Sequence, residues 1–482
     1  MYEVFSMKYP KSVKKLFRAF EDADHDLYLV GGAVRDWALG EPVEKLDDLD
    51  FCTDARPEAT AEIIEGAGLQ LYELGAEFGT VGAVIYGEGP GFPKDVQVTT
   101  YRSEEYYRRG SRHPTVRFGD TIEQDLGRRD FSINSMALDG NGDLFDPYDG
   151  KSDLDEGILR VIGDPYETLA EDPLRILRVG RFMSKLGFEP TPVLREAATE
   201  RAEGILEISA ERWLQEMTKL LKGPFVSKAM RFLHDVRILG MILPEIESLK
   251  GFHASSTVPH TDLWNHTLQV VEQAPRTKQL RWAALLHDIG KRWTRVIRED
   301  ETVEFPAHER QGAMLFEGIA RRFRLDNDTA AEVRFLIANH DRAPHYPGGY
   351  QSSWSAPDVR RWALSMDPYI DGMLELSRAN ITADDDELDD ATRRIDELRR
   401  RIERMAEDGT LRPELPSGIG NDLMEALELE PSPAIGEIKE WLEDEIIEER
   451  IESNRSPSYY VQHLRESSPD FLKELLNNQT ME

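Results

Sequence analysis

One short segment constrains the fold of this chain more than any other: the apolar run of residues 27–30 stops at two consecutive glycines, Gly31 and Gly32. Residues 33–39 are then typical of the start of a helix. The pattern predicts a buried strand, a glycine turn and a helix. Glycines at such a turn let a phosphate group approach the backbone, and the free N–H groups of a helix N-terminus favour its charge. Arg35 adds a fixed cation beside this turn.

Two acidic residues follow about a dozen residues later, in a second predicted strand over 48–51. Alternate residues of a strand share a face, so Asp48 and Asp50 point together while Leu49 and Phe51 point into the core. Two neighbouring carboxylates repel each other unless a cation lies between them, and Mg²⁺ binds both carboxylate oxygens and substrate phosphates. Taken singly, each signal has an ordinary alternative, because Gly-Gly turns are common and Asp-x-Asp pairs are often solvated. Together they predict nucleotidyl transfer.

In this order and spacing, the two segments resemble the polymerase-β-type nucleotidyltransferase superfamily. Residues 31–36, the Asp48-x-Asp50 pair and the Ala-Arg-Pro-Glu sequence at 55–58 are similar to those of bacterial CCA-adding tRNA nucleotidyltransferases and their poly(A) polymerase relatives. The resemblance implies a head domain that binds CTP and ATP with Mg²⁺, and a tRNA whose acceptor arm and 3′ end are the partner.

The segment 127–134 fits the same reading, because two adjacent arginines precede an Asp. Guanidinium groups bind phosphate, and a carboxylate accepts hydrogen bonds from ribose hydroxyls. A lone Arg-Arg-Asp sequence is usually surface charge. Here it resembles the second motif of the family, in which the residue matching Arg129 contacts the nucleotide, and we expect Asp130 in the same site.

A helix is predicted from Glu171 to Phe182, with Pro173 in its first turn. Charged residues recur in it at every third position and so form a ridge along one face. The members of this ridge are Asp172, Arg175, Arg178 and Arg181. A salt-bridged amphipathic helix with no binding role would show the same pattern.

Base chemistry gives the ridge a sharper interpretation. Cytosine and adenine each present an amino donor beside a ring-nitrogen acceptor, so Asp172 can accept from the amino group while Arg175 donates to the ring nitrogen. Uracil and guanine place a carbonyl oxygen against the carboxylate. In the family the matching Asp and Arg select the base, and those matching Arg178 and Arg181 line the nucleotide site. Residues 209–212 resemble the motif that closes this region.

Two further segments bear on the site. The polar, basic and aromatic stretch 101–114 resembles the family's flexible loop that couples base selection to turnover, although an ordinary solvent loop has the same composition.

Relatives often carry an acidic residue where this chain has Gln97, and a neutral amide is a weak magnesium ligand. Either Asp48 and Asp50 suffice for the metal, or Asp95 contributes.

Composition limits the class of protein. The length of 482 residues predicts three or four domains. The single Cys52 excludes an internal disulfide framework and fits a reducing compartment. No signal peptide and no apolar run of membrane-spanning length is found, so a soluble cytoplasmic protein without a membrane partner is expected. The net charge of −32 is unexpected for an RNA-binding protein, and it predicts a basic channel within an acidic exterior.

The expected fold class is multidomain α+β. An N-terminal α/β nucleotidyltransferase head with a mixed sheet is followed by an all-α neck, an HD-type helical body and a helical tail whose end is loosely ordered. The predicted domains are the head at 1–150, the neck that binds the nucleotide base and RNA at 151–225, the HD-type domain at 226–385 and the tail at 386–482.

A second set of residues points to other chemistry. Its members, in the order H…HD…H…H, are His266, His287, Asp288, His308 and His340. The order resembles the HD metal-dependent phosphohydrolase superfamily, and His with Asp ligands suits manganese, nickel or iron better than magnesium. The pattern normally ends in an Asp, where this chain has Asn380. A helical scaffold that positions tRNA without a metal is the alternative.

The sequence therefore predicts template-independent addition of C and A nucleotides to tRNA 3′ ends. A poly(A) polymerase is the nearest rival, and a partial enzyme that adds only C or only A stays open. An HD-type phosphohydrolase with a vestigial head is a rival of another class. It is disfavoured by the intact residues of the head and neck, which are Asp48, Asp50, Arg129, Asp172 and Arg175. The oligomeric state is left open.

Overall fold

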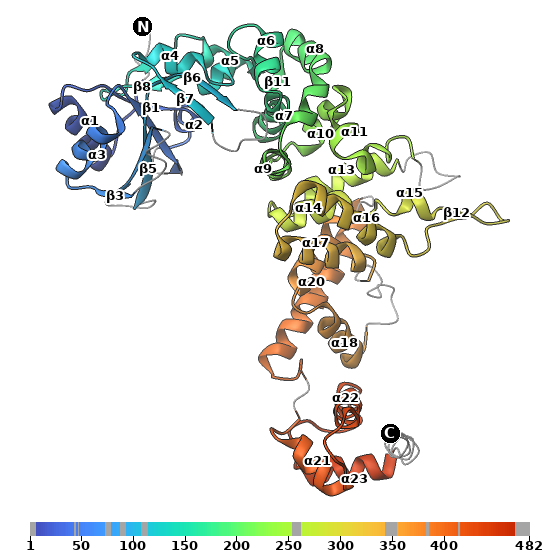
Figure 1. The fold of residues 1–482 in the computed structure, drawn as a ribbon. Coiled ribbons are helices and arrows are strands. Elements are labelled where there is room, and N and C mark those ends of the chain that lie inside the picture. Colours follow the sequence, from blue (N-terminus) through green and yellow to red (C-terminus); the bar gives the residue numbers. More distant parts are fainter. Residues whose placement is uncertain are drawn as a thin grey trace. The chain divides into compact units, whose positions relative to one another are not determined.

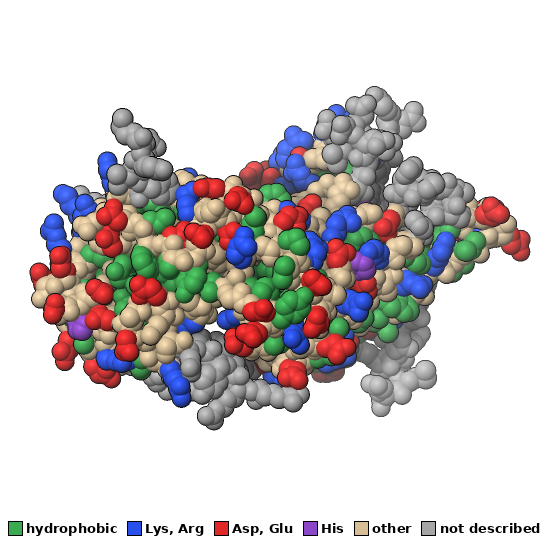
Figure 2. All heavy atoms as spheres, turned by 90° about the horizontal axis from the view of Figure 1, so that it is seen from above, with side chains coloured by type: hydrophobic (Ala, Val, Ile, Leu, Met, Phe, Trp, Pro, Cys, Tyr) green, Lys and Arg blue, Asp and Glu red, His purple; other side chains and the backbone are tan. Residues whose placement is uncertain are grey.

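The computed structural model describes residues 6–42, 45–46, 48–72, 79–86, 93–107, 114–252, 262–342, 354–381, 385–412 and 415–467. The chain separates into two compact units, 1–331 and 332–482, each of which we describe by itself. Within the described ranges, no helix is both long and apolar enough to cross a membrane. On the face shown in Figure 2, Asp and Glu side chains are scattered among those of Lys and Arg.

The first unit begins with a mixed seven-stranded sheet in the order β3-β4-β5-β2-β1-β8-β9. Strands β2 and β5 are parallel, and the other neighbours are antiparallel. The strands are β1 (Leu27–Val30), β2 (Leu49–Thr53), β3 (Gln70–Tyr72), β4 (Thr80–Ile85), β5 (Lys94–Thr100), β8 (Ala137–Leu138) and β9 (Leu144–Phe145).

Helices α1 (Lys11–Asp22), α2 (Gly32–Ala38) and α3 (Pro57–Gly66) pack around this sheet (Figure 1). The side chains of Leu49 and Phe51 are buried, which confirms the predicted core face of β2. Asp48 immediately precedes the strand, which begins one residue later than the sequence predicts. A two-stranded ribbon, β6 (Arg102–Tyr107) with β7 (Pro114–Phe118), leads to α4 (Ile122–Gly127).

The described part of this ribbon contradicts the expectation of a loop over residues 101–114. The stretch 101–114 was expected to be a loop, but its first half forms β6 and pairs with β7. Backbone hydrogen bonds between these strands satisfy the polar groups that a loop would leave to water. Residues 108–113 lie outside the described residues.

Beyond residue 150 the first unit is mostly helical, as predicted. Its helices are α5 (Gly150–Glu156), α6 (Pro165–Glu171), α7 (Leu174–Leu186), α8 (Pro192–Glu200), α9 (Ala210–Leu221), α10 (Val226–Asp235), α11 (Ile238–Ile242), α12 (Pro244–Glu247), α13 (Leu263–Gln273), α14 (Lys278–Leu286), α15 (Lys291–Thr294) and α16 (His308–Phe323). Short pairs of strands interrupt them: β10 (Ile158–Leu159) with β11 (Glu189–Pro190), and β12 (Val296–Ile297) with β13 (Val303–Glu304).

The helix expected from Glu171 to Phe182 is divided in the structure. Helix α6 ends at Glu171, Asp172 has extended backbone, and α7 begins after Pro173. Proline disfavours helical backbone in the residue before it, which explains the break at Asp172. The break places the Asp172 carboxylate at the junction of two helices.

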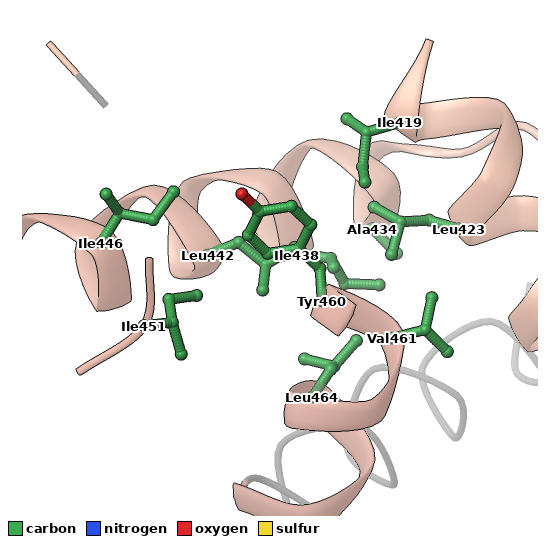
Figure 3. Packing of buried hydrophobic residues seen from close by; sticks show 10 residues of the cluster. All are labelled: Ile419, Leu423, Ala434, Ile438, Leu442, Ile446, Ile451, Tyr460, Val461 and Leu464. Atoms are coloured by element: carbon green, nitrogen blue, oxygen red, sulfur yellow. The ribbon is translucent and has the colours of Figure 1, made fainter. Parts of the chain in front are cut away.

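Helix α17 (Asn327–Asn339) leads into the second unit, which continues with α18 (Ala356–Met366), α19 (Ile370–Ala379), α20 (Asp385–Glu407), α21 (Ile419–Leu427), α22 (Pro433–Ile447) and α23 (Pro457–Ser467). Figure 3 shows the apolar cluster that joins the last three helices. The expectation that the end of the tail is loosely ordered is therefore wrong for α23. Tyr460, Val461 and Leu464 bury one face of this helix against α21 and α22.

Candidate active site

A cleft of about 1580 Å³ lies in the first unit, between the sheet and the helices that follow it. It is lined by every residue that the sequence predicted for the nucleotide and magnesium sites. These are Gly31, Gly32, Arg35, Asp48, Asp50, Arg129, Asp130, Asp172, Arg175, Arg178 and Arg181. Segments up to 150 residues apart in the sequence thus converge on one cavity.

The glycine turn lies directly against Arg129. Gly31 has a φ of +72°, a conformation that favours glycine over other residues, and α2 begins at the next residue. A Cβ atom at Gly31 would lie only 3.1 Å from Arg129 Nη1. A larger residue here would strain the backbone and crowd the Arg129 guanidinium. The position therefore requires both the positive φ that glycine tolerates and its lack of a side chain.

One buried carboxylate holds both arginines of the second motif. Asp125 on α4 is fully buried, and its Oδ1 accepts from Arg128 Nη2 at 2.7 Å while its Oδ2 accepts from Arg129 Nη2 at 2.8 Å. Burial alone would raise the pKa of Asp125, but Arg129 and Arg128 outweigh it and lower that pKa to about 2. The carboxylate stays ionised and fixes both guanidinium groups at the cleft.

Asp48 and Asp50 both line the cleft, and they lie close enough for their charges to interact. Burial raises the pKa of Asp50, Arg129 opposes this effect, and the neighbouring charge of Asp48 raises the pKa further. A buried carboxylate beside a second one is stabilised by a bound cation, and oxygen ligands are those that Mg²⁺ prefers. The donor set therefore suits magnesium.

Gln97 pairs in register with Asp50 across the parallel β2–β5 ladder, so the amide does lie next to the carboxylate pair. Asp95 is two residues earlier on the same exposed face of β5. The pKa of Tyr72 is raised by burial first and then by the charges of Asp95 and Asp48, which places both carboxylates near one phenol.

A continuous hydrogen-bonded network crosses the cleft. Arg35, which is buried, donates from Nη1 to Asn134 Oδ1 at 2.6 Å. Asn134 in turn donates from Nδ2 to Asp130 Oδ1 at 3.0 Å, and Arg178 donates from Nε to Asp130 Oδ2 at 2.7 Å. Burial raises the pKa of Asp130, but Arg178 and Asn134 lower it more. The network joins α2, the second motif and α7.

Glu216 on α9 completes this network from the other side. It is 4% exposed, and its Oε1 accepts from Arg178 Nη1 and from Arg181 Nη1, each at 3.3 Å. Desolvation lowers the pKa of Arg181, an effect that Glu216 partly offsets. Two ridge arginines are thus held by one buried carboxylate.

Asp172 lies at the α6–α7 junction with both oxygens engaged. Its Oδ2 accepts from Arg212 Nη2 at 2.8 Å, and its Oδ1 accepts from the Leu174 backbone N–H at 3.2 Å. Each carboxylate oxygen has a second lone pair, so Asp172 keeps acceptor capacity for a ligand. Arg175 donates to the Arg128 backbone carbonyl at 3.3 Å, which keeps its guanidinium at the second motif.

The roles of Asp125, Asn134 and Glu216 were not predicted from the sequence. The spacing of Asp125 to Arg128 and Arg129, three and four residues, was a usable signal because such residues are neighbours on a helix. Glu216 has no such local signal, since its arginine partners lie on a different helix.

The histidine set forms a separate cluster in the first unit. His266 Nε2 lies 3.3 Å from His287 Nε2 and 3.5 Å from Asp288 Oδ2, and these three residues could hold a metal ion. His308 Nε2 lies 3.4 Å from Asp288 Oδ1. Burial would raise the pKa of Asp288, but His287 and Lys291 hold it well below its usual range.

The histidines share one orientation. Nδ1 of His287 donates to the Ala284 carbonyl at 2.8 Å, and Nδ1 of His308 donates to the Phe305 carbonyl at 3.0 Å. These bonds fix the tautomer and leave Nε2 as the ligand atom, as in many metal sites. The described residues of this cluster therefore fit a transition-metal site.

His340 belongs to the second unit and follows α17. Its Nδ1 donates to the Ile337 carbonyl at 2.8 Å, in the same pattern as the other two histidines. Asn380 follows α19 in that unit. Its side-chain oxygen is buried and accepts no hydrogen bond from any residue that the structure describes.

Family models match three consecutive parts of the chain. The poly(A) polymerase head domain matches residues 27–160, a probable RNA- and SrmB-binding site of polymerase A matches 187–250, and the HD domain matches 263–389. The multifunctional CCA protein of Pseudomonas fluorescens (strain Pf0-1) is 35% identical over 328 residues, which cover 66% of this chain and 75% of that protein.

The chain belongs to the family of CCA-adding enzymes. Another member, the CCA-adding enzyme of Geobacillus stearothermophilus, is 34% identical over 266 residues, or 55% of this chain and 60% of that protein. The predicted family, head domain and HD region are therefore confirmed.

Solved structures of the family share the fold. A crystal structure of the Bacillus stearothermophilus CCA-adding enzyme with CTP covers 96% of this chain and 100% of that chain, with a TM-score of 0.67 and 24% identity. A complex of a CCA-adding enzyme with ATP covers 94% of each chain, with a TM-score of 0.58 and 18% identity. The predicted mixed α/β head followed by a helical body is confirmed.

Proposed function

We propose that this chain adds C and A nucleotides to the 3′ ends of tRNA from CTP and ATP, without a template. The tRNA 3′ hydroxyl attacks the α-phosphate, a new phosphodiester bond forms, and pyrophosphate leaves. The observation that carries the proposal is the convergence of the Asp48–Asp50 pair, Arg129 and the Asp172–Arg175 pair on one cleft. The reaction is expected in the cytoplasm, where Cys52 stays reduced.

Each side of the cleft has a proposed role. Asp48 and Asp50 would hold two magnesium ions, which would supply the charge that activates the attacking hydroxyl and stabilises the leaving oxygen. Gly31 and Gly32 leave room for the triphosphate at the turn. Arg35 and Arg129 neutralise the charge of the triphosphate. Each guanidinium is already held in place by a hydrogen bond, that of Arg35 to Asn134 and that of Arg129 to Asp125.

The base is proposed to bind at the α6–α7 junction. Asp172 accepts from the amino group of cytosine or adenine, and Arg175 donates to the adjacent ring nitrogen. Arg212 fixes the carboxylate through its hydrogen bond to Asp172, so the acceptor is held before the nucleotide arrives. Arg178 and Arg181 line the same site, while Asp130 accepts from the ribose and orients Arg178.

The proposal is tested with a tRNA transcript that lacks its CCA end and with labelled CTP or ATP. Asp48→Ala and Asp50→Ala should each lower incorporation to less than about a tenth of wild type, because each removes a metal ligand. Binding of the tRNA should persist. Asp120→Ala removes an exposed carboxylate outside the cleft and serves as the matched control. Near-normal incorporation by either site variant would refute the assignment.

The histidine cluster supports a second candidate function, hydrolysis of phosphoesters such as 2′,3′-cyclic phosphates. In that reaction water attacks phosphorus, one ribose oxygen leaves with the proton, and a phosphomonoester remains. The supporting observation is the shared Nε2-out orientation of His287 and His308 beside Asp288. A manganese, nickel or iron ion held there would supply the charge that activates water. Metal analysis of the purified protein tests whether a transition metal is bound.

A further inference from the structure

A strongly basic segment stands out in this acidic chain. Residues 291–298 carry four basic side chains and no acidic one, although the whole chain has a net charge of −32. They form α15 and β12, the first arm of the β12–β13 hairpin (Figure 1). Most side chains of this segment are exposed to solvent. The rest of the hairpin, residues 299–304, carries four acidic side chains, and Arg298 pairs with Glu304, so the basic surface that could take a negatively charged ligand is restricted to the α15 end of the segment.

Two of its arginines share a single aromatic ring. The guanidinium carbons of Arg292 and Arg295 lie 5.2 Å and 5.4 Å from the centre of the Phe252 ring, which is itself buried. Among the described residues, neither arginine forms an ion pair with a carboxylate. Cation–π contact restrains both side chains. Two restrained cations so close together repel each other, and an anion between them would relieve the repulsion.

The same segment exposes apolar side chains. Trp293 is 50% exposed, and Val296 and Ile297 on β12 are also exposed. An exposed indole between two arginines has the composition of surfaces that bind unpaired nucleic acid. There, bases stack on aromatic rings while guanidinium groups contact the phosphates. The bases of a duplex are already stacked on each other, so an exposed Trp favours single-stranded RNA over a duplex.

The segment that carries α15 and the hairpin, residues 291–307, lies in the sequence between two members of the histidine cluster. Asp288 precedes this segment by three residues, and Lys291 Nζ donates to Asp288 Oδ2 at 2.7 Å. His308 follows it, and Nδ1 of His308 donates to the carbonyl of Phe305, a residue whose ring packs against Phe252. A strand of RNA on the hairpin would therefore lie beside the candidate metal ligands.

We propose that Arg292, Trp293 and Arg295 form a binding surface for single-stranded RNA, which presents the strand to the cluster of His266, His287 and Asp288. This inference deepens the second candidate function by naming its substrate class as unpaired RNA. It concerns binding alone, so it can be tested whether or not the cluster hydrolyses anything.

The test measures the affinity of the full-length protein for a labelled, unstructured oligouridine over a series of KCl concentrations. Arg292→Ala/Arg295→Ala should weaken binding and flatten the slope of log K against log salt by about 1.4, because each single-strand phosphate contact contributes about 0.7. Trp293→Ala should weaken binding by about tenfold, and Trp293→Phe should retain much of the affinity, since stacking persists on a smaller ring.

A double variant on α1, Lys14→Ala/Arg18→Ala, removes two exposed charges at a distance in the sequence and is the matched control. It should leave both affinity and salt slope near wild type. Unchanged binding in the Arg292/Arg295 variant would overturn the proposal, as would an equal loss in the α1 control. Incorporation of CMP into tRNA, measured on the same variants, reports separately on the head. If the wild-type protein incorporated no CMP, the main proposed function would be refuted, but the conclusion about RNA binding by the basic segment would still hold.

Discussion

Arg178 on α7 donates a hydrogen bond from Nε to Asp130 Oδ2 over 2.7 Å. The two residues come from different parts of the first unit, since Asp130 follows α4 of the head while α7 belongs to the helical region. The Arg178 guanidinium also contacts Glu216 on α9. Arg178 thus connects two parts of the cleft. One part is proposed to bind the phosphates and the ribose, and the other is proposed to bind the base.

Asp130→Asn should lower kcat/KM for both CTP and ATP by about tenfold or more, because a charge-assisted hydrogen bond in a desolvated site is lost. Steady-state kinetics with each nucleotide measure the effect. Asp235→Asn is the control, since it changes an exposed carboxylate that pairs with Arg195 at 3.5 Å, and such surface pairs contribute little. A loss confined to one nucleotide would contradict a role in holding the cleft together.

Asp172→Ala and Arg175→Ala should relax discrimination against UTP and GTP and lower incorporation of both correct nucleotides. Each variant removes one of the two groups proposed to read the pairing edge, and an unmatched buried polar group typically costs about 1–3 kcal/mol. Competition between CTP and UTP on one tRNA measures the ratio. Arg195→Ala, outside the cleft, should leave that ratio unchanged. Unaltered selectivity in both site variants would mean that other groups read the base.

Asp125→Asn should destabilise the first unit at neutral pH. The folded-state pKa of Asp125 is lowered from 3.8 to about 2, so its ionised form contributes stability above pH 3.8 that is lost as the pH falls towards about 2. The shift corresponds to about 2 kcal/mol. Thermal unfolding at a series of pH values measures the difference between variant and wild type.

That difference should be constant above about pH 4 and should narrow below it. Asp139→Asn provides a comparison, because its carboxylate accepts hydrogen bonds from the backbone N–H groups of Asn141 and Asp143 within an exposed turn. A difference that widened as the pH fell would contradict the assigned direction of the Asp125 pKa shift.

His287→Ala should abolish bound transition metal and any phosphoester hydrolysis, while CCA addition stays near normal. The variant removes a fully buried Nε2 from the cluster, and the nucleotide cleft is lined by other residues. Metal analysis and a phosphodiesterase assay with added manganese or nickel measure the two effects. His25→Ala, which changes a half-buried histidine paired with Asp54, is the control. Hydrolysis that survives in the variant would place the activity elsewhere.

Much of the head could be predicted from sequence because its signals are local. The apolar run, the glycine turn and the alternation around Asp50 correctly predicted β1, α2 and the buried face of β2. The break between α6 and α7 was missed, although Pro173 is the physical reason for it. The pattern of charges at every third residue outweighed that proline in the sequence-based interpretation.

Contacts between distant elements could not be predicted in the same way. Glu216 holds two arginines from another helix, and Asn134 joins Arg35 to Asp130 across the cleft. No periodicity within one element encodes such partners, since they depend on how the helices pack against the sheet. The basic character of residues 291–298 was visible in the sequence, but the stacking of Arg292 and Arg295 on Phe252 required the structure.

The most direct measurement is the sequence of the products. A tRNA transcript without its CCA end is incubated with the purified protein and all four nucleoside triphosphates, and the new 3′ ends are sequenced. The proposed function predicts C, C and A in that order, followed by termination, with U and G absent. A long run of A, addition of C or A alone, or incorporation of U and G at comparable levels would contradict it.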